Sequence, residues 1–363
     1  MTFTATTRRL AGAAVVCAAA ALSVPAAAPA VFGDAQILAP FPANPGFPEG
    51  VAVRDGKVYA AGAATFGTTG SGPSAVVSFD RATGAQAGRL DTQGENLLAE
   101  HGGSSIAFDA AGKLYVLNTQ LGTLRLDPDT GVQEQYTPPF PDLNPCLAPV
   151  VNPPCSPSPL PLPPLPNDIA FGPDGSAYVT DSMQATIWRI PKGGGTPQIW
   201  FQDSRFNSPY IGVNGVRVSP GNTRVYVTVS VDLAGQASVY SLPIGPGKPT
   251  AAQMKLEHRF PAGDLPDGIA FGEHKDLFVS MASPTAPGVK ILRPDGTLNA
   301  QIKNPGGNLT APFDGPANIA FDGAGRIVMT NHAPVTGLAL RTFSIVDVEV
   351  GDKGWPLNTP AIG

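Results

Sequence analysis

The chain has 363 residues, of which 42% are hydrophobic and 14% are charged, so it can bury a sizeable core and does not have the composition of a disordered charged protein. Its 42 glycines and 40 prolines exclude a fold made mainly of long helices and favour many short strands joined by tight turns. The net charge is −5 and no basic block occurs, so we expect no nucleic-acid partner.

Residues 1–30 have the three parts of a secretory signal peptide. Arg8 and Arg9 provide a positive start, and an apolar run then leads to the small-residue cleavage site Ala28-Pro29-Ala30. The apolar run is shorter than the roughly 18 residues that a membrane-spanning helix needs, and no other segment could span a membrane. We therefore predict a secreted or extracytoplasmic protein whose mature domain covers residues 31–363.

A proline-rich insertion, residues 138–166, interrupts the mature chain and holds its two cysteines. Proline lacks a backbone donor, so we expect an extended loop there and not a strand. In an oxidising compartment Cys146 and Cys155 would form a disulfide across this loop. Two free thiols are the alternative.

One sequence pattern recurs six times in the mature chain. Each copy has a small or polar pair, an apolar-Ala-apolar run, a turn, and then a strand with an aromatic or β-branched residue. The copies begin at residues 49, 104, 167, 214, 267 and 317, with spacings of about 47 to 63 residues that are typical of propeller blades. The third copy predicts four strands, at residues 169–171, 177–181, 186–190 and 198–201.

Four antiparallel strands repeated six times predict an all-β fold, a six-bladed β-propeller with a central channel. We expect residues 342–350 to form the last outer strand of the sixth blade. Residues 34–38 can pair beside that strand and close the ring of blades.

The first residue of each copy would lie at one rim of the central channel and face its counterparts. These residues are Glu49, Ser104, Asn167, Asn214, Asp267 and Ala317. Four of the six carry oxygen ligands, and two carboxylates would repel each other across a narrow channel without a cation. The set suits one hard divalent cation, calcium foremost, with magnesium, manganese or zinc as alternatives. Ordinary turn chemistry at strand starts is the other explanation for these residue types.

The motifs around these positions resemble those of the gluconolactonase, senescence-marker-protein-30 and luciferin-regenerating-enzyme family, which is similar to the paraoxonases and the squid-type diisopropylfluorophosphatase. The motifs are Pro48-Glu49-Gly50, Pro166-Asn167-Asp168-Ile169-Ala170-Phe171, Val213-Asn214-Gly215 and Pro266-Asp267-Gly268-Ile269-Ala270-Phe271. The resemblance covers residues 47–350 and implies a propeller with a catalytic divalent cation, usually calcium, in the channel.

The resemblance also implies roles for individual residues. It implies that Glu49, Asn214 and Asp267 hold the ion. Asn167 would be a further ligand or a substrate contact, and Asp168 would orient the asparagine ligands from behind. Two features depart from the family pattern: Ser104 stands where paraoxonases carry a histidine, and the proline-rich insertion has no counterpart.

Two of the four histidines fall on the face of the channel where the six copies begin. His332 follows the second strand of the sixth copy and is the better candidate for a proton carrier or substrate contact, with a hydrogen-bonded rim histidine as the alternative. His101, Ser104 and Asn318 are further candidates for substrate binding. No recognisable triad accompanies Ser104.

These inferences predict a secreted, monomeric hydrolase that opens a lactone or ester bond of a small molecule. Sugar lactones follow from the resemblance, and phosphotriesters are the alternative substrate. The cation would polarise the carbonyl while Asp267 acts as general base or nucleophile. A non-catalytic secreted propeller that binds a protein or a glycan stays open. A strictosidine-synthase-like enzyme is disfavoured, because such enzymes do not use this set of ligands.

Overall fold

The computed structural model describes residues 1–2, 31–146, 154–334, 336–337 and 342–362. The chain divides into two units, Met1–Val31 and Phe32–Gly363, and every strand belongs to the second unit. The predicted signal peptide lies outside the described residues, except for its first two. In the described part of the chain no helix is both long enough and apolar enough to cross a membrane.

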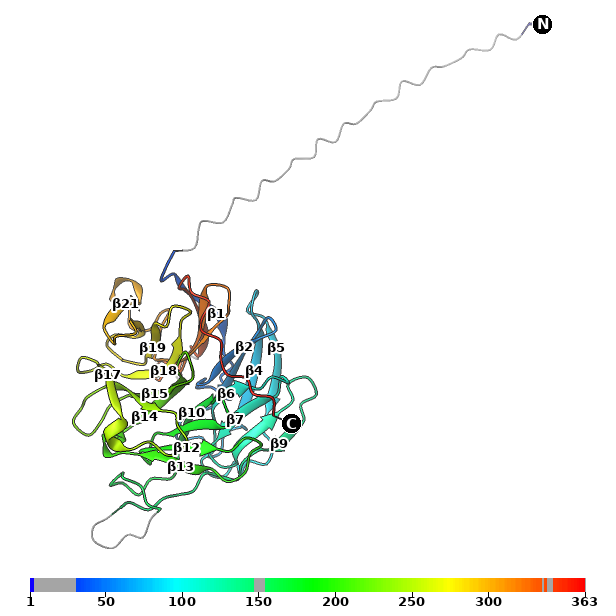
Figure 1. The fold of residues 1–363 in the computed structure, drawn as a ribbon. Helices are drawn as coiled ribbons and strands as arrows, with labels where there is room; N and C mark the ends of the chain where they lie inside the picture. Colours follow the sequence, from blue (N-terminus) through cyan, green and yellow to red (C-terminus); the bar gives the residue numbers. More distant parts are fainter. Residues whose placement is uncertain (3–30, 147–153, 335, 338–341, 363) are drawn as a thin grey trace. The chain divides into compact units, whose positions relative to one another are not determined.

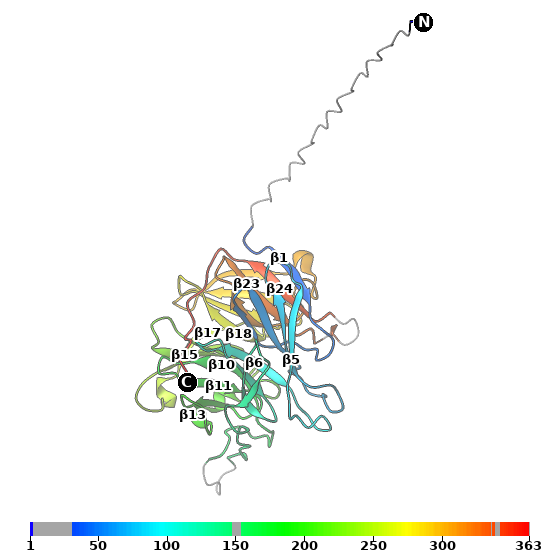
Figure 2. The same ribbon diagram turned by 90° about the vertical axis from the view of Figure 1, so that its right-hand side faces the viewer.

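The strands form six four-stranded antiparallel sheets, as predicted (Figures 1 and 2). Blade 1 contains β2 (Val51–Arg54), β3 (Lys57–Gly62), β4 (Ala75–Asp80) and β5 (Gln86–Asp91). Blade 2 contains β6 (Gly103–Phe108), β7 (Leu114–Asn118), β8 (Gly122–Leu126) and β9 (Gln133–Gln135). Blade 3 contains β10 (Pro166–Phe171), β11 (Ala177–Asp181), β12 (Thr186–Ile190) and β13 (Gln198–Gln202).

The remaining blades follow the same order. Blade 4 contains β14 (Val213–Val218), β15 (Arg224–Val229), β16 (Ser238–Pro243) and β17 (Lys255–Arg259). Blade 5 contains β18 (Pro266–Phe271), β19 (Leu277–Met281), β20 (Gly288–Leu292) and β21 (Leu298–Lys303). Blade 6 contains β22 (Pro316–Phe321), β23 (Arg326–Asn331), β24 (Ser344–Glu349) and β1 (Ala35–Pro40). In the described ranges, three short 3-10 helices lie between strands, at Ser204–Phe206, Ala251–Gln253 and Pro305–Gly307.

The first strand, β1, closes the ring of blades. β1 pairs antiparallel with β24, with Ala35 opposite Val348 and Pro40 opposite Ser344, which confirms the predicted closure. The innermost strands β2, β6, β10, β14, β18 and β22 contact one another in that order, and β22 contacts β2. The six innermost strands therefore surround one central channel.

The core lies between blades. The buried apolar side chains fall into six clusters, and each cluster joins two neighbouring blades. A repeated aromatic contact contributes to four of these interfaces. In each, an aromatic ring on the second strand of one blade packs edge-on against the phenylalanine that ends the innermost strand of the following blade. The pairs are Tyr59–Phe108, Tyr115–Phe171, Tyr226–Phe271 and Phe278–Phe321. This packing explains the aromatic position of the repeat.

The proline-rich insertion is an extended loop that docks on blade 3. Cys146 and Cys155 are joined by a disulfide, with their Cα atoms 5.1 Å apart. Gln184 holds the loop from blade 3: its Oε1 accepts from Leu143 N at 2.7 Å, and its carbonyl accepts from Ser156 Oγ at 2.8 Å. Residues 147–153 of the loop lie outside the described part.

Candidate metal centre

In five of the six blades a β-bulge at the start of the innermost strand lies at the first residue of the copy. In blades 2 to 6 the pairing with the second strand shifts register there, for example between Pro166 and Ile169 and between Pro266 and Ile269. In blade 1 the residues before β2 make equivalent contacts, since Glu49 N donates to Ala61 O at 2.8 Å. A bulge re-aims side chains, so it can turn the first residue of each copy toward the channel mouth.

Hydroxyl groups of the second strands hold these bulges from the preceding blade. Thr228 Oγ1 accepts from Gly215 N at 2.8 Å and donates to Asp267 O at 2.7 Å. Three further hydroxyls donate to the equivalent carbonyl of the next blade; the pairs are Thr180 to Asn214, Ser280 to Ala317 and Thr330 to Glu49. Three of the four candidate ligands, Glu49, Asn214 and Asp267, are therefore fixed through their own backbone.

Glycine follows three of the ring residues because neighbouring blades approach closely there. A Cβ atom on Gly268 would lie 2.6 Å from Asn318 Oδ1 and 2.7 Å from Asn318 Cα. A Cβ atom on Gly215 would lie 2.4 Å from Asp267 O. Glycine is required at these positions because a larger side chain would not fit. Backbone conformation does not require it, since the φ angles of these glycines are not positive.

We expect Gly268→Ala to destabilise the protein by about 1–3 kcal/mol, because the new methyl group must displace Asn318. Thermal unfolding would measure the loss. Gly245→Ala is the matched control, since nothing lies within 4 Å of its would-be Cβ atom. Equal midpoints for the two variants would show that blades 5 and 6 do not meet as closely as described.

The four candidate ligands lie in this ring with free oxygen atoms. Glu49 is 7% exposed and Asn214 is 3% exposed. Asn214 Nδ2 donates to Ser230 Oγ at 3.0 Å, which orients the amide, yet Asn214 Oδ1 is buried without a hydrogen-bond partner. Asp267 Oδ1 is also buried without a partner. Asn167 makes no side-chain hydrogen bond with any described residue.

The surroundings of the ring disfavour the negatively charged form of Asp267. Burial, followed by the nearby charges of Glu49 and Asp168, raises the pKa of Asp267 well above its usual range. Two carboxylates and unpaired amide oxygens fit a hard divalent cation, which prefers oxygen ligands and would offset both negative charges. No cluster of three or more His, Cys, Asp or Glu side chains occurs within the described ranges, so a site here depends on the amide oxygens.

His332 lies beside the ring but faces a candidate ligand. Its Nδ1 is 3.0 Å from Glu49 Oε2. The side chain of Phe47 packs against the imidazole of His332, with the two ring centroids 5.2 Å apart. The contact places His332 next to Glu49, although its Nδ1 has no hydrogen-bond partner among the described residues. Its role as proton carrier stays a prediction. Asp314, a buried acid near His332, was missed in the sequence, and burial raises its pKa.

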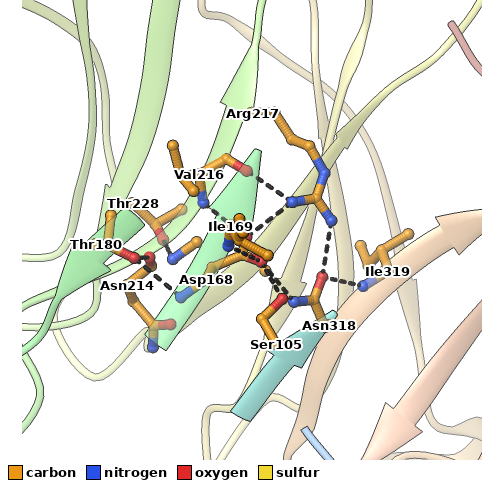
Figure 3. A network of polar contacts seen from close by, with 12 residues as sticks. Ser105, Asp168, Ile169, Thr180, Asn214, Val216, Arg217, Thr228, Asn318 and Ile319 are labelled. Atoms are coloured by element: carbon orange, nitrogen blue, oxygen red, sulfur yellow. Dashed lines mark hydrogen bonds and ion pairs between the residues drawn. The ribbon is translucent and has the colours of Figure 1, made fainter. Parts of the chain in front are cut away.

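A buried ion pair lies in the channel behind the ring (Figure 3). Asp168 is fully buried, and its Oδ2 accepts from Arg217 Nη1 at 2.9 Å and from Val216 N at 2.8 Å. Its Oδ1 accepts from Ser105 Oγ at 2.5 Å, Ile169 N at 2.9 Å and Asn318 Nδ2 at 3.2 Å. The carboxylate is thus held by donors from four blades.

This network differs from the role expected for Asp168. Its side chain contacts neither Asn167 nor Asn214, and the one asparagine side chain that it holds is Asn318. Asp168 can act on the two asparagines of the ring through the backbone, since it follows Asn167 and binds the amide of Val216, two residues after Asn214. Its charge acts on Asp267 directly. Asn318 also accepts from Arg217 Nη2 at 3.2 Å, so it belongs to the network, and its role in substrate binding stays a prediction.

Arg217 is the functional residue that sequence reasoning missed. Its signal was visible in the repeat, because the middle position of the apolar run is alanine in five copies, Ala52, Ala107, Ala170, Ala270 and Ala320, and arginine only in the fourth. One long cation among five small residues in a channel marks a side chain that crosses the channel.

Two other predicted substrate contacts have structural roles. Ser104 is buried, and its Oγ donates to Pro166 O at 2.6 Å, joining blades 2 and 3. His101 is buried with Nδ1 2.8 Å from Ala99 O and Nε2 3.0 Å from Gly72 O. Burial disfavours a charged ring, but these two carbonyls outweigh it and raise the pKa of His101. Both side chains are engaged within the protein, and their roles in substrate binding stay predictions.

No family model and no curated protein matches the chain by sequence. Several solved structures share its fold. A calcium-binding regucalcin from Agrobacterium tumefaciens is 16% identical over 92% of this chain and 98% of its own, with a TM-score of 0.62. A gluconolactonase from Xanthomonas campestris is 19% identical over 84% of this chain and 86% of its own, with a TM-score of 0.55. A luciferin-regenerating enzyme is 11% identical over 90% of this chain and 99% of its own, with a TM-score of 0.58. These neighbours carry the names of the family that the motifs resemble, and at such identities they show that the chain has the six-bladed propeller fold of these proteins.

Proposed function

We propose that the protein is a divalent-metal-dependent hydrolase of lactones or esters, with calcium as the cation and sugar lactones as the substrate class. The observation that carries the proposal is the pair of buried, unpartnered oxygens, Asn214 Oδ1 and Asp267 Oδ1, in one ring with the carboxylate of Glu49. Buried polar atoms are nearly always paired, so unpaired oxygens facing a channel indicate a ligand. The fold shared with regucalcin and gluconolactonase supports the same site.

Glu49, Asn167, Asn214 and Asp267 would hold the ion, which supplies electrophilic polarisation of a carbonyl oxygen when it is bound. Ser230 fixes the amide of Asn214 with the oxygen toward the channel. His332 lies next to Glu49 at the rim. Asp267 would accept a proton from the attacking water, because it combines a free buried oxygen with a carboxylate that a neighbouring cation keeps ionised.

A calcium titration of chelator-treated protein, followed by thermal unfolding, tests the metal site. A ligand at 100 times its Kd stabilises the native state by about 2.7 kcal/mol, so the midpoint should rise and saturate. Glu49→Gln should remove the shift. Glu273→Gln is the control, because Glu273 is exposed in the hairpin of blade 5 and should keep the shift.

Hydrolysis of D-glucono-1,5-lactone and of dihydrocoumarin by the calcium-loaded protein then tests the reaction. We expect turnover that a chelator abolishes. The absence of a shift with calcium, magnesium, manganese and zinc would overturn the metal site. A calcium shift with no turnover of any lactone or ester would overturn the hydrolase and leave a metal-binding propeller.

A further inference from the structure

A cavity occupies the part of the channel that lies beyond the Asp168–Arg217 pair, away from the candidate metal ring. Its volume is about 880 Å³, and its walls come from the later part of the innermost strands and from residues 353–359. None of the six ring residues lines it. The hairpin residues Gly56 and Gly323 do, so the cavity opens at the mouth of the channel opposite the candidate metal ring. Ligand cavities are typically of about this size.

The cavity wall is mostly apolar and includes several aromatic rings. The phenylalanines that end four innermost strands line it, as do the channel alanines; the phenylalanines are Phe108, Phe171, Phe271 and Phe321. Ala52, Ala107 and Ala320 are only partly buried although they lie on the innermost strands, which shows that the space beside them is open. A ligand that fills this space needs an apolar body.

Basic side chains outnumber acidic ones in the lining although the protein carries a net charge of −5. The lining includes four basic side chains, Arg54, Arg81, Arg217 and Lys353, and two acidic ones, Asp55 and Asp322. Arg81 is paired with Asp322 at 2.7 Å and with Asp347 at 2.8 Å. Lys353 makes no ion pair with any described residue. Arg54 is paired with Asp55 at 3.1 Å and Arg217 with Asp168 at 2.9 Å. An anionic group on the ligand would therefore meet one cation without a charged partner, Lys353.

Arg217 supplies donors at the inner end of the cavity. A guanidinium has five N–H donors. Three are used within the network, toward Asp168, Val216 O and Asn318 (Figure 3), which leaves two for a further acceptor. Two neighbouring N–H groups of a planar guanidinium match the two oxygens of a carboxylate.

The C-terminal segment lies across the opening and contributes Lys353 and Trp355 to the wall. Trp355 N donates to Phe271 O at 2.7 Å, and Asn358 Nδ2 donates to Phe171 O at 3.0 Å. Ile362 is buried in the cluster between blades 2 and 3. The segment is thus tied to blade 5 at one side and to blades 2 and 3 at the other, without regular secondary structure.

We propose that this far-mouth cavity binds an organic monocarboxylate with an apolar body, with its carboxylate directed to Arg217 and Lys353 and its body against the phenylalanines. The site is separate from the candidate metal ring. It therefore does not depend on the proposed hydrolase activity.

Isothermal titration of the purified protein with 2-naphthoate and with 2-naphthamide, in the presence of chelator, tests the proposal. The two probes have the same shape and differ in charge. We expect one saturable site for naphthoate and at least roughly tenfold weaker binding of the amide, because only the anion meets the free donors. Adding calcium should leave naphthoate binding unchanged, since the ring does not line the cavity.

Two variants locate the site. Ala320→Leu should weaken naphthoate binding roughly tenfold or more by filling the cavity. Lys353→Gln should weaken it roughly threefold to tenfold, whereas Lys248→Gln, at an exposed turn of blade 4, should leave it unchanged. Lys353 is exposed, so its variant should fold normally. Equal affinity for the two probes, binding that requires calcium, or no binding at millimolar naphthoate would each overturn the proposal.

Discussion

Asp168→Ala should destabilise the protein by about 3–5 kcal/mol, because removing one partner of a buried ion pair leaves the other charge uncompensated. The Arg217 side chain would keep only the Val216 carbonyl oxygen and the Asn318 amide oxygen as acceptors. Arg217 is only 8% exposed, so water would not replace the lost carboxylate. The backbone amides of Ile169 and Val216 would lose their acceptor as well. Urea unfolding of the chelator-treated protein would measure the change without a contribution from metal binding.

The double variant Asp168→Ala/Arg217→Met should recover part of this loss, since no buried charge remains. Asp91→Ala is the control for a surface pair: Asp91 lies 2.6 Å from Arg89, and its side chain is 53% exposed. Surface pairs contribute little, so we expect a change within about 1 kcal/mol. If Asp168→Ala behaved like Asp91→Ala, the Asp168–Arg217 pair would not be the buried centre of the channel.

The blades were predictable because their signals are local and repeated. In blade 3 the expected strands agree with β10 to β13 except at their ends: β10 begins at Pro166, three residues earlier than predicted. The early start reflects the bulge at Asn167 and Asp168, where turn-forming residue types stay within the strand. The closure of the ring by β1 was predictable for a different reason, since the sixth copy lacks a fourth strand of its own.

The ring was predictable as a position in the repeat, whereas the surroundings of each side chain were not. His101 was expected to face the channel, but its orientation is set by Gly72 O, 29 residues away in a loop of blade 1. Asn318 was expected to meet substrate, but Asp168, 150 residues away, holds its amide. Such contacts depend on how blades face one another, which a single repeat does not record. Arg217 is the exception, because comparison of the copies marks it directly.

Asp267→Asn should lower kcat for lactone hydrolysis by about 10²-fold or more at saturating calcium, because the isosteric amide cannot accept a proton from water. The same change removes one ligand charge, so calcium affinity should also fall. Initial rates across a calcium titration separate the two effects: weaker calcium binding alone is overcome by more calcium, whereas loss of the base is not. Asp295→Asn, in an exposed turn of the same blade, is the matched control and should retain full activity.

The stability of the metal-free protein checks the same residue without catalysis. Burial, Glu49 and Asp168 raise the pKa of Asp267 in the folded state. The protonated Asp267 therefore contributes to the free energy of unfolding. This contribution is fully present below the unfolded-state pKa of about 3.9 and is lost as the pH rises through the folded-state pKa. Burial also raises the pKa of Asp181, to about 6, which gives a slope of the same sign in both proteins. The unfolding midpoint of the wild type in chelator should therefore fall more steeply with rising pH than that of Asp267→Asn. Parallel pH profiles would show that Asp267 does not titrate in the ring, and calcium would then have no proton to displace there.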